Sequence, residues 1–176
     1  MEETKMHRPR FVIYHANPKG TGCAVKMDLH PAHDFSDGCL MAKFARQISV
    51  GGNVDGEDRF PRFDWENAII VKLDFSDLSK MLQVFLGECE SIEDGKGIYH
   101  RSQKAVTKIM MRHLVEPVQG YSIEVYKSPI SGDGQETSAR ILLHNNEALG
   151  LTRAIEGVMP LVCFGIPMVI PKEAMV

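Results

Sequence analysis

The sequence predicts an α+β domain in which four strands and a helix are followed by four more strands and a second helix. Segments that alternate apolar and polar residues fall into two groups, and glycine- and proline-rich turns separate the segments. Each group ends where the apolar spacing changes from that of a strand to that of a helix. Runs of strands followed by a helix favour antiparallel sheets with helices packed on one side.

Length and composition suit one compact domain. A chain of 176 residues buries roughly 70 % of its unfolded surface, and 44 % hydrophobic residues exclude a wholly disordered protein. We expect residues 1–10 to form a flexible arm, residues 11–165 a single domain and residues 166–176 a tail. No stretch of about 18 consecutive apolar residues is present, so no membrane-spanning helix is expected. The N-terminus lacks the apolar core of a signal peptide, and the four cysteines are widely spaced, so we expect a cytoplasmic protein with free thiols.

In the first half, strands are expected over residues 11–16, 23–30, 39–46 and 68–75. The second strand alternates most clearly, with one apolar face made of Cys23, Val25, Met27 and Leu29. In the third strand, Leu40, Ala42 and Phe44 alternate with Met41, Lys43 and Ala45. Residues 51–61 hold three glycines and three acidic residues, which indicates a mobile loop between the third and fourth strands.

The first helix is expected to begin after Ser76, a residue type that caps helices, and to end near residues 93–95. Its helical period is seen at Leu78, Met81, Leu82, Phe85, Leu86 and Cys89.

In the second half, strands are expected over residues 96–100, 105–115, 121–127 and 138–144, with turns at 117–120 and 131–134. A second helix is expected to be capped by Asn145 or Asn146, with a kink or an early stop at Pro160. This helix is apolar on more than one side, which favours burial of its second face against another copy of the chain. The alternative is a helix that its own sheets enclose.

The motifs of common enzymes are absent from the sequence. The glycines at 20 and 22 lie between two strands, and no phosphate loop or GxSxG sequence occurs. His30 and His33 flank Pro31 without a third metal ligand nearby in the sequence, and Cys89 and Cys163 are expected to be small buried residues. We therefore expect no enzyme, no cofactor and no metal.

Local charge favours a binding protein. The net charge is -3, yet residues 96–115 carry five Lys or Arg and no Asp or Glu. Alternate strand residues point the same way, so Lys108 and Arg112 share a face, while Tyr99 lies in the strand before and Arg101 directly follows that strand. Proteins that bind single-stranded nucleic acid combine such cations with aromatic rings on which bases stack. The alternative is an ordinary solvated sheet face.

Six short motifs occur in order along residues 18–165: 19–25 (KGTGCAV), 38–44 (GCLMAKF), 63–66 (FDWE), 98–100 (IYH), 120–123 (GYSI) and 163–165 (CFG). In order and spacing they resemble motifs of the Whirly family of single-stranded DNA-binding proteins. More distantly, the chain is similar to a transcriptional coactivator with a ββββα unit and to kinetoplastid guide-RNA-binding proteins. Thr21 replaces a second lysine of the plant motif, and no tryptophan follows Gly165.

The resemblance implies two roughly perpendicular four-stranded antiparallel sheets with two helices behind them, and a homo-oligomer, a tetramer by likeness. It also implies binding of single-stranded DNA with little sequence preference, in DNA repair, other DNA metabolism or the regulation of transcription. The expected nucleic-acid contacts are Lys19, Lys26, Lys43, Phe44, Trp65, Tyr99, Arg101, Lys108 and Arg112. The assignment of Lys19 and Trp65 as contacts rests on the resemblance, whereas the assignment of Lys108 and Arg112 rests on the charge pattern. Two alternatives stay open: a protein that binds single-stranded RNA, and a protein-interaction scaffold of the same fold.

Overall fold

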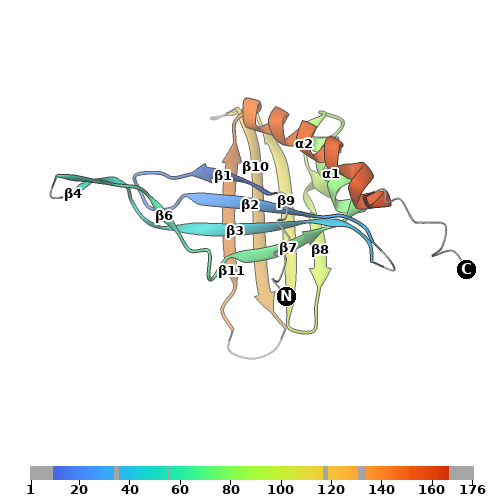
Figure 1. Ribbon diagram of the computed structural model, residues 1–176, viewed down its shortest axis with the longest axis horizontal. Coiled ribbons are helices and arrows are strands. Elements are labelled where there is room, and N and C mark those ends of the chain that lie inside the picture. The colour runs from blue at the N-terminus through green and yellow to red at the C-terminus, as the bar shows by residue number, and fades with distance from the viewer. Residues whose placement is uncertain (1–9, 34–35, 55, 117–118, 131–133, 167–176) are drawn as a thin grey trace, which may run out of the picture.

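The computed structural model describes residues 10–33, 36–54, 56–116, 119–130 and 134–166. It confirms the α+β class: two antiparallel sheets pack face to face with their strands crossing, and two helices pack against them at one end (Figure 1). The predicted arm before residue 10 and nearly all of the predicted tail lie outside the described residues. Within the described residues, neither helix combines the length and the apolar character that crossing a membrane requires.

The first sheet contains β1 (Arg10–His15), β2 (Cys23–His30), β3 (Cys39–Ser49), β6 (Arg62–Phe63) and β7 (Ile69–Leu73). The strands run in the order β1-β2-β3, and both β6 and β7 pair with β3 on the side away from β2. The four predicted strands are therefore present, and the two-residue β6 is an addition to them. Strand β3 extends three residues beyond its predicted end.

Residues 51–61 were expected to form a mobile loop, and the structure contradicts the loop. This segment forms an antiparallel hairpin of β4 (Gly52–Val54) and β5 (Glu57–Arg59), which projects from the body of the protein (Figure 1). Asn53 stabilises it, because its side chain accepts a hydrogen bond from the Gly56 N–H at 3.1 Å and donates one to Asp58 at 3.0 Å. Gly56 has a φ of 84°, a conformation that glycine adopts without strain.

The second sheet contains β8 (Ile98–Arg101), β9 (Ala105–Leu114), β10 (Gly120–Pro129) and β11 (Thr137–Leu143), in the order β11-β10-β9-β8. Its strands confirm the four that were predicted. The register places Lys108 of β9 between Tyr99 of β8 and Tyr126 of β10. The predicted turns at 117–120 and 131–134 fall partly outside the described residues.

The N-cap of helix α1 (Phe75–Phe85) lies two residues before the predicted cap. Asp74 is its N-cap: the Asp74 carboxylate accepts a hydrogen bond from the Asp77 N–H at 3.0 Å, and the Asp77 carboxylate accepts one from the Asp74 N–H at 3.3 Å. Ser76 therefore lies within the first turn. The helix also ends earlier than predicted, because Gly87 takes a positive φ of 76°, and a separate 3₁₀ turn (Ile92–Gly95) follows.

Helix α2 (Asn145–Phe164) is capped by His144, not by Asn145 or Asn146. The His144 N–H donates a hydrogen bond to the Glu147 carboxylate at 2.9 Å, which satisfies a donor at the helix start. The helix does not stop at Pro160 but continues to Phe164. Proline has no N–H, so the Glu156 carbonyl lacks its helical hydrogen bond. Pro160 is exposed, so this carbonyl can face water.

The hydrophobic core lies between the two sheets and under the helices. It unites the apolar faces of β2 and β3 with side chains of the second sheet and both helices, including Val25, Met27, Phe44, Leu78, Met81, Ile109, Met111, Ile123, Val125, Ile141 and Ile155. All four cysteines are free; Cys23 and Cys39 are buried, and burial raises the pKa of Cys23 to about 12. The prediction of burial is wrong for Cys163, which is exposed at the end of α2.

Candidate nucleic-acid interface

A groove of about 550 Å³ lies between the two sheets. It lies where the first sheet extends past the edge strand β11 of the second sheet (Figure 1). Its first wall comes from the turn before β2 and the last part of β3, and its second from the middle of β10 and the first half of β11. We call it the inter-sheet groove; its residues are 20–23, 46–48, Asp64, Glu124, Tyr126 and 138–140.

The turn that borders the groove is held by two amide side chains. The Asn17 Oδ1 atom accepts hydrogen bonds from the N–H groups of Lys19 and Thr21, at 3.0 and 3.1 Å. The Oε1 atom of the buried Gln47 accepts from the N–H groups of Asn17 and Gly22, at 2.9 and 3.1 Å. Lys19 therefore stands on a rigid support beside the groove, with its own side chain exposed.

A hydrogen-bonded carboxylate forms part of the second wall. Glu124 accepts hydrogen bonds from Tyr126 at 2.6 Å and Ser122 at 3.0 Å, and it lies 3.2 Å from Arg112 and 3.4 Å from Arg140. Burial works to raise the pKa of Glu124, but the hydrogen bonds and the two arginines outweigh it, so the pKa is lowered. The predicted phosphate contact Arg112 is thus partly neutralised, although its side chain stays 53 % exposed.

The outward face of the second sheet continues from the groove. Tyr126 lines both the groove and a shallow depression of about 260 Å³, which it shares with Tyr99 and Lys108. The Lys108 ammonium lies 5.2 Å from the centre of the Tyr99 ring, within range of a cation–π interaction. Arg101 is exposed two residues after Tyr99, so it shares this face.

A separate cluster of cations and rings lies on the outward face of the first sheet. The Lys26 ammonium is 5.7 Å from the centre of the Trp65 ring, and Lys43 is the register partner of Lys26 on the neighbouring strand. The Tyr14 ring packs on Phe63 at 5.6 Å and lies edge-on to Trp65 at 6.4 Å. This cluster therefore joins three predicted residues to Tyr14 and Phe63, two aromatic residues that were not among the expected contacts.

Phe44 requires a correction. It was expected to stack on or shelter a base, but its side chain is only 3 % exposed and lies in the hydrophobic core. The physical reason is the alternation of β3, which turns Lys43 outward and Phe44 inward. For the other predicted residues the structure gives positions only, and their contact with nucleic acid stays a prediction.

Sequence reasoning did not single out Arg46, Tyr126 and Arg140, which line the groove. Alternation in β11 could have indicated that Arg140 points outward, between the buried Ala139 and Ile141. The position of Tyr126 beside Lys108 depends on the register of two strands, for which one sequence carries no direct signal.

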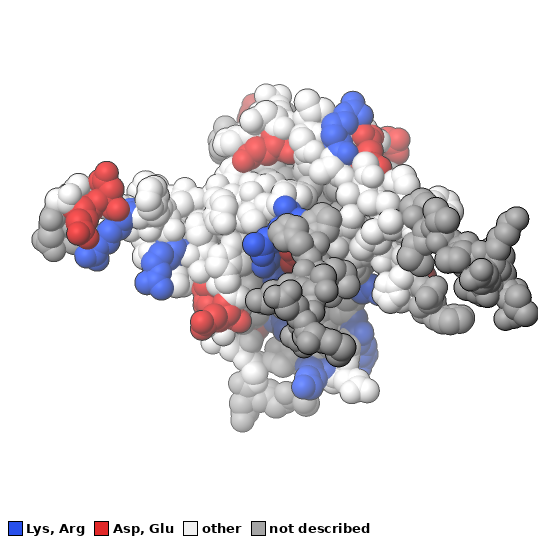
Figure 2. Space-filling model, in the orientation of Figure 1, with Lys and Arg blue, Asp and Glu red and all other residues white. Residues whose placement is uncertain are grey.

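Charged side chains form small groups on the face that Figure 2 shows. Lys and Arg lie over the middle strands of the first sheet and towards the lower ends of the second sheet, and also on the β4–β5 hairpin and over the helices, where acidic side chains lie next to them (Figure 2). This agrees with the net charge of -3. On this face, binding of a polyanion would depend on local contacts rather than on one continuous basic patch.

No protein-family model and no curated protein sequence matches this chain. Its structure is similar to the crystal structure of WHY1 from Arabidopsis thaliana, with a TM-score of 0.70 and 16 % identity over 92 % of this chain and 89 % of that one. It is also similar to the crystal structure of WHY3 from Arabidopsis thaliana, with a TM-score of 0.64 and 18 % identity over 89 % of this chain and 92 % of that one. Because both are Whirly proteins, the chain has the Whirly-like fold that its six motifs predict.

Proposed function

We propose that this protein binds single-stranded DNA with little sequence preference, on the outward face of the second sheet and in the inter-sheet groove. The observation that carries the proposal is the placing of Lys108 over the exposed Tyr99 ring, beside the depression that Tyr126 connects to the groove. Binding of single strands needs cations that follow the phosphates and flat rings on which bases stack. Because every base has a flat face that can stack on an aromatic ring, stacking gives only a weak sequence preference.

The groove supplies the cations that would continue the path of the strand. Arg46 projects from the end of β3 on one wall and Arg140 from β11 on the other, and both side chains are exposed. Lys19 stands beside them on the turn before β2. A strand that leaves Tyr99 and Lys108 can thus meet arginine or lysine on both walls of the groove.

The cluster of Lys26, Lys43 and Trp65 provides a second contact surface on the other sheet. It repeats the combination of cation and aromatic ring on a rigid set of strands. In an oligomer such a surface can hold the strand as it passes from one protomer to the next.

Self-association through the helices is part of the proposal, with a homo-tetramer as the expected assembly. Large apolar side chains are exposed on α2 and at the end of α1, with Leu149 58 % and Leu86, the residue after α1, 54 % exposed. Such side chains gain stability when a second copy covers them. Light scattering after size exclusion measures the assembly, and Leu149→Glu is expected to lower its mass. A wild-type monomer would contradict this part.

Fluorescence anisotropy of a labelled single strand of about 30 nucleotides, titrated at several salt concentrations, tests DNA binding. We expect the logarithm of the affinity to fall linearly with the logarithm of the salt concentration, because phosphate contacts release counterions. Lys108→Ala is expected to reduce that slope by about 1. Lys127→Ala is the matched control, since Lys127 is exposed on the same sheet but alternates to the opposite face.

Competition with duplex DNA and with RNA of the same length separates the alternatives. Preference for single-stranded DNA supports the proposal, and tighter binding of RNA would favour the RNA-binding alternative. Failure to bind either single strand at low salt would contradict the proposal. It would favour the alternative in which the outward faces of the sheets bind a protein.

A further inference from the structure

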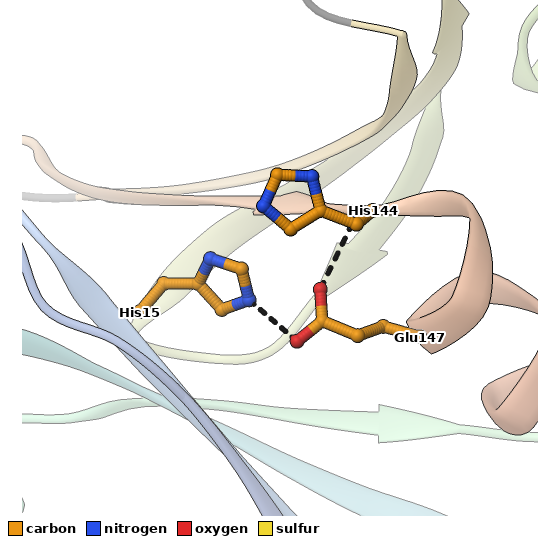
Figure 3. Close-up of side chains that lie close together, drawn as sticks. All are labelled: His15, His144 and Glu147. Atoms are coloured by element: carbon orange, nitrogen blue, oxygen red, sulfur yellow. Dashed lines mark hydrogen bonds and ion pairs between the residues drawn. The ribbon is translucent and has the colours of Figure 1, made fainter.

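Two imidazoles and a carboxylate meet where β1 ends and α2 begins (Figure 3). His15 is the last residue of β1, His144 caps α2, and Glu147 lies in the first turn of that helix. One nitrogen of each histidine and one oxygen of Glu147 lie within 4.8 Å of one another. The three residues come from distant parts of the chain, so the fold creates the cluster.

The carboxylate already points into the cluster. One oxygen of Glu147 accepts the His144 N–H at 2.9 Å, and the other lies 2.8 Å from the His15 Nε2 atom (Figure 3). The helix cap therefore uses one oxygen, and the second pairs with His15 in a contact that a bound ion would replace. The His15 and Glu147 side chains are 24 % and 26 % exposed, so an ion has access to the site without full desolvation.

We propose that His15, His144 and Glu147 form a binding site for a divalent transition-metal ion, with zinc the best match. Two imidazole nitrogens and one carboxylate oxygen are a donor set that zinc takes up with three protein ligands and a water in the fourth position. Alkaline-earth ions prefer sites made of oxygen alone, and the two imidazoles disfavour them. His144 is exposed, so its ring can turn toward the ion.

An ion at this site joins the two halves of the chain. β1 is an edge strand of the first sheet, and His144 directly follows β11 of the second sheet. A bound ion fixes both to the start of α2. It stabilises the folded protein by a free energy that rises with the logarithm of the free ion concentration divided by the dissociation constant, because the unfolded chain does not hold the three ligands together. The inference does not depend on DNA binding, since none of the three residues lines the inter-sheet groove.

Cobalt(II) is the spectroscopic probe for this site, since its visible absorption is strong only in low-coordinate environments. The full-length protein, freed of metal with a chelator, is titrated with Co²⁺ and then with Zn²⁺ in competition. We expect saturation at one equivalent, without the near-ultraviolet band that a cysteine ligand such as the exposed Cys163 would produce.

His144→Ala is the decisive variant, because it removes a ligand and leaves the contact between His15 and Glu147 in place. We expect its Co²⁺ affinity to fall by at least about tenfold, since loss of even an outer partner of a ligand costs 10–100-fold. His33→Ala, which changes an exposed histidine outside the cluster, is the matched control and should keep wild-type affinity.

Glu147→Gln gives a second test that preserves the helix cap, because the amide oxygen can still accept the His144 N–H. It should also lose Co²⁺ affinity, and added Zn²⁺ should raise the unfolding temperature of the wild type and His33→Ala by more than that of either cluster variant. Wild-type protein that shows no saturable Co²⁺ binding, or His144→Ala that binds as tightly as the wild type, would overturn the proposal.

Discussion

The Lys108 ammonium lies 5.2 Å from the centre of the Tyr99 ring, and the two residues are register partners on β9 and β8. The free protein thus covers one face of an exposed ring with its own cation. A base that stacks on Tyr99 would displace the ammonium, which then becomes free to pair with a phosphate. One rearrangement would supply both contacts that a single strand needs.

Replacing Tyr99 with alanine should weaken the binding of single-stranded DNA about tenfold, because stacking contributes roughly 1–3 kcal/mol per base. The side chain is 59 % exposed, so the fold should survive its loss. Anisotropy titrations of Tyr99→Ala and Tyr99→Phe measure the effect. The phenylalanine variant keeps the ring and should bind like the wild type, whereas equal affinity of all three proteins would remove Tyr99 from the interface.

Acid should lower the free energy of unfolding, partly because it protonates Glu124. Its pKa is lowered in the folded state from the ordinary value of 4.5, against the effect of burial, by its hydrogen bonds and the nearby arginines. The ionised group therefore stabilises the fold above pH 4.5, and that stability is lost as the pH falls through the lowered pKa.

Urea unfolding at a series of pH values checks this with Glu124→Gln as the comparison. The wild type should be the more stable at neutral pH, and the difference in the free energy of unfolding should shrink below pH 4.5. A difference that stays constant down to pH 2 would contradict the assignment.

The capping of α1 by Asp74 can be separated from capping by Ser76. Asp74→Ala removes the acceptor of the Asp77 N–H and should lower the free energy of unfolding by about 1 kcal/mol. Ser76→Ala, a change at an exposed position in the first turn, should alter it by less than about 0.5 kcal/mol. Chemical denaturation of both variants measures the two losses of stability. A larger loss for Ser76→Ala than for Asp74→Ala would identify Ser76 as the cap.

Gly22 is expected to tolerate no side chain. A Cβ atom there would lie 2.2 Å from the His15 carbonyl oxygen and 2.4 Å from the Gln47 Oε1 atom. Gly22→Ala should therefore cost about 1–3 kcal/mol, the usual range for overpacking. Gly150→Ala, in α2 with open space around it, should instead stabilise the protein by up to about 1 kcal/mol. Thermal unfolding of the two variants should give shifts of opposite sign.

The strands were predictable because their signal is local. Alternation alone gave the bounds of β2, Cys23–His30, and its buried face. The same alternation grouped Phe44 with Leu40 and Ala42, so the pattern already favoured the core for Phe44. The helix starts were harder, since Asp74, Ser76 and Asp77 are all residue types that can cap, and only the backbone conformation selects one of them.

The candidate site was predictable only where it lies within one strand. Lys108 and Arg112 share a face by alternation, but the link from Arg112 to Glu124 crosses to another strand and reduces its free charge. Tyr126 and Arg140 reach the groove because of strand register and the crossing of the sheets. Neither is encoded in the spacing of nearby residues.

The turn between β1 and β2 uses its own backbone donors. The N–H groups of Asn17, Lys19, Gly20, Thr21 and Gly22 all donate hydrogen bonds to Asn17 or Gln47. Loops that cradle the phosphates of a free nucleotide need such N–H groups unengaged. An anion at this turn would therefore be bound by long basic side chains. Because these side chains are flexible, they can adjust to uneven spacing of phosphates. The groove thus suits a flexible polymer better than ATP or a similar metabolite.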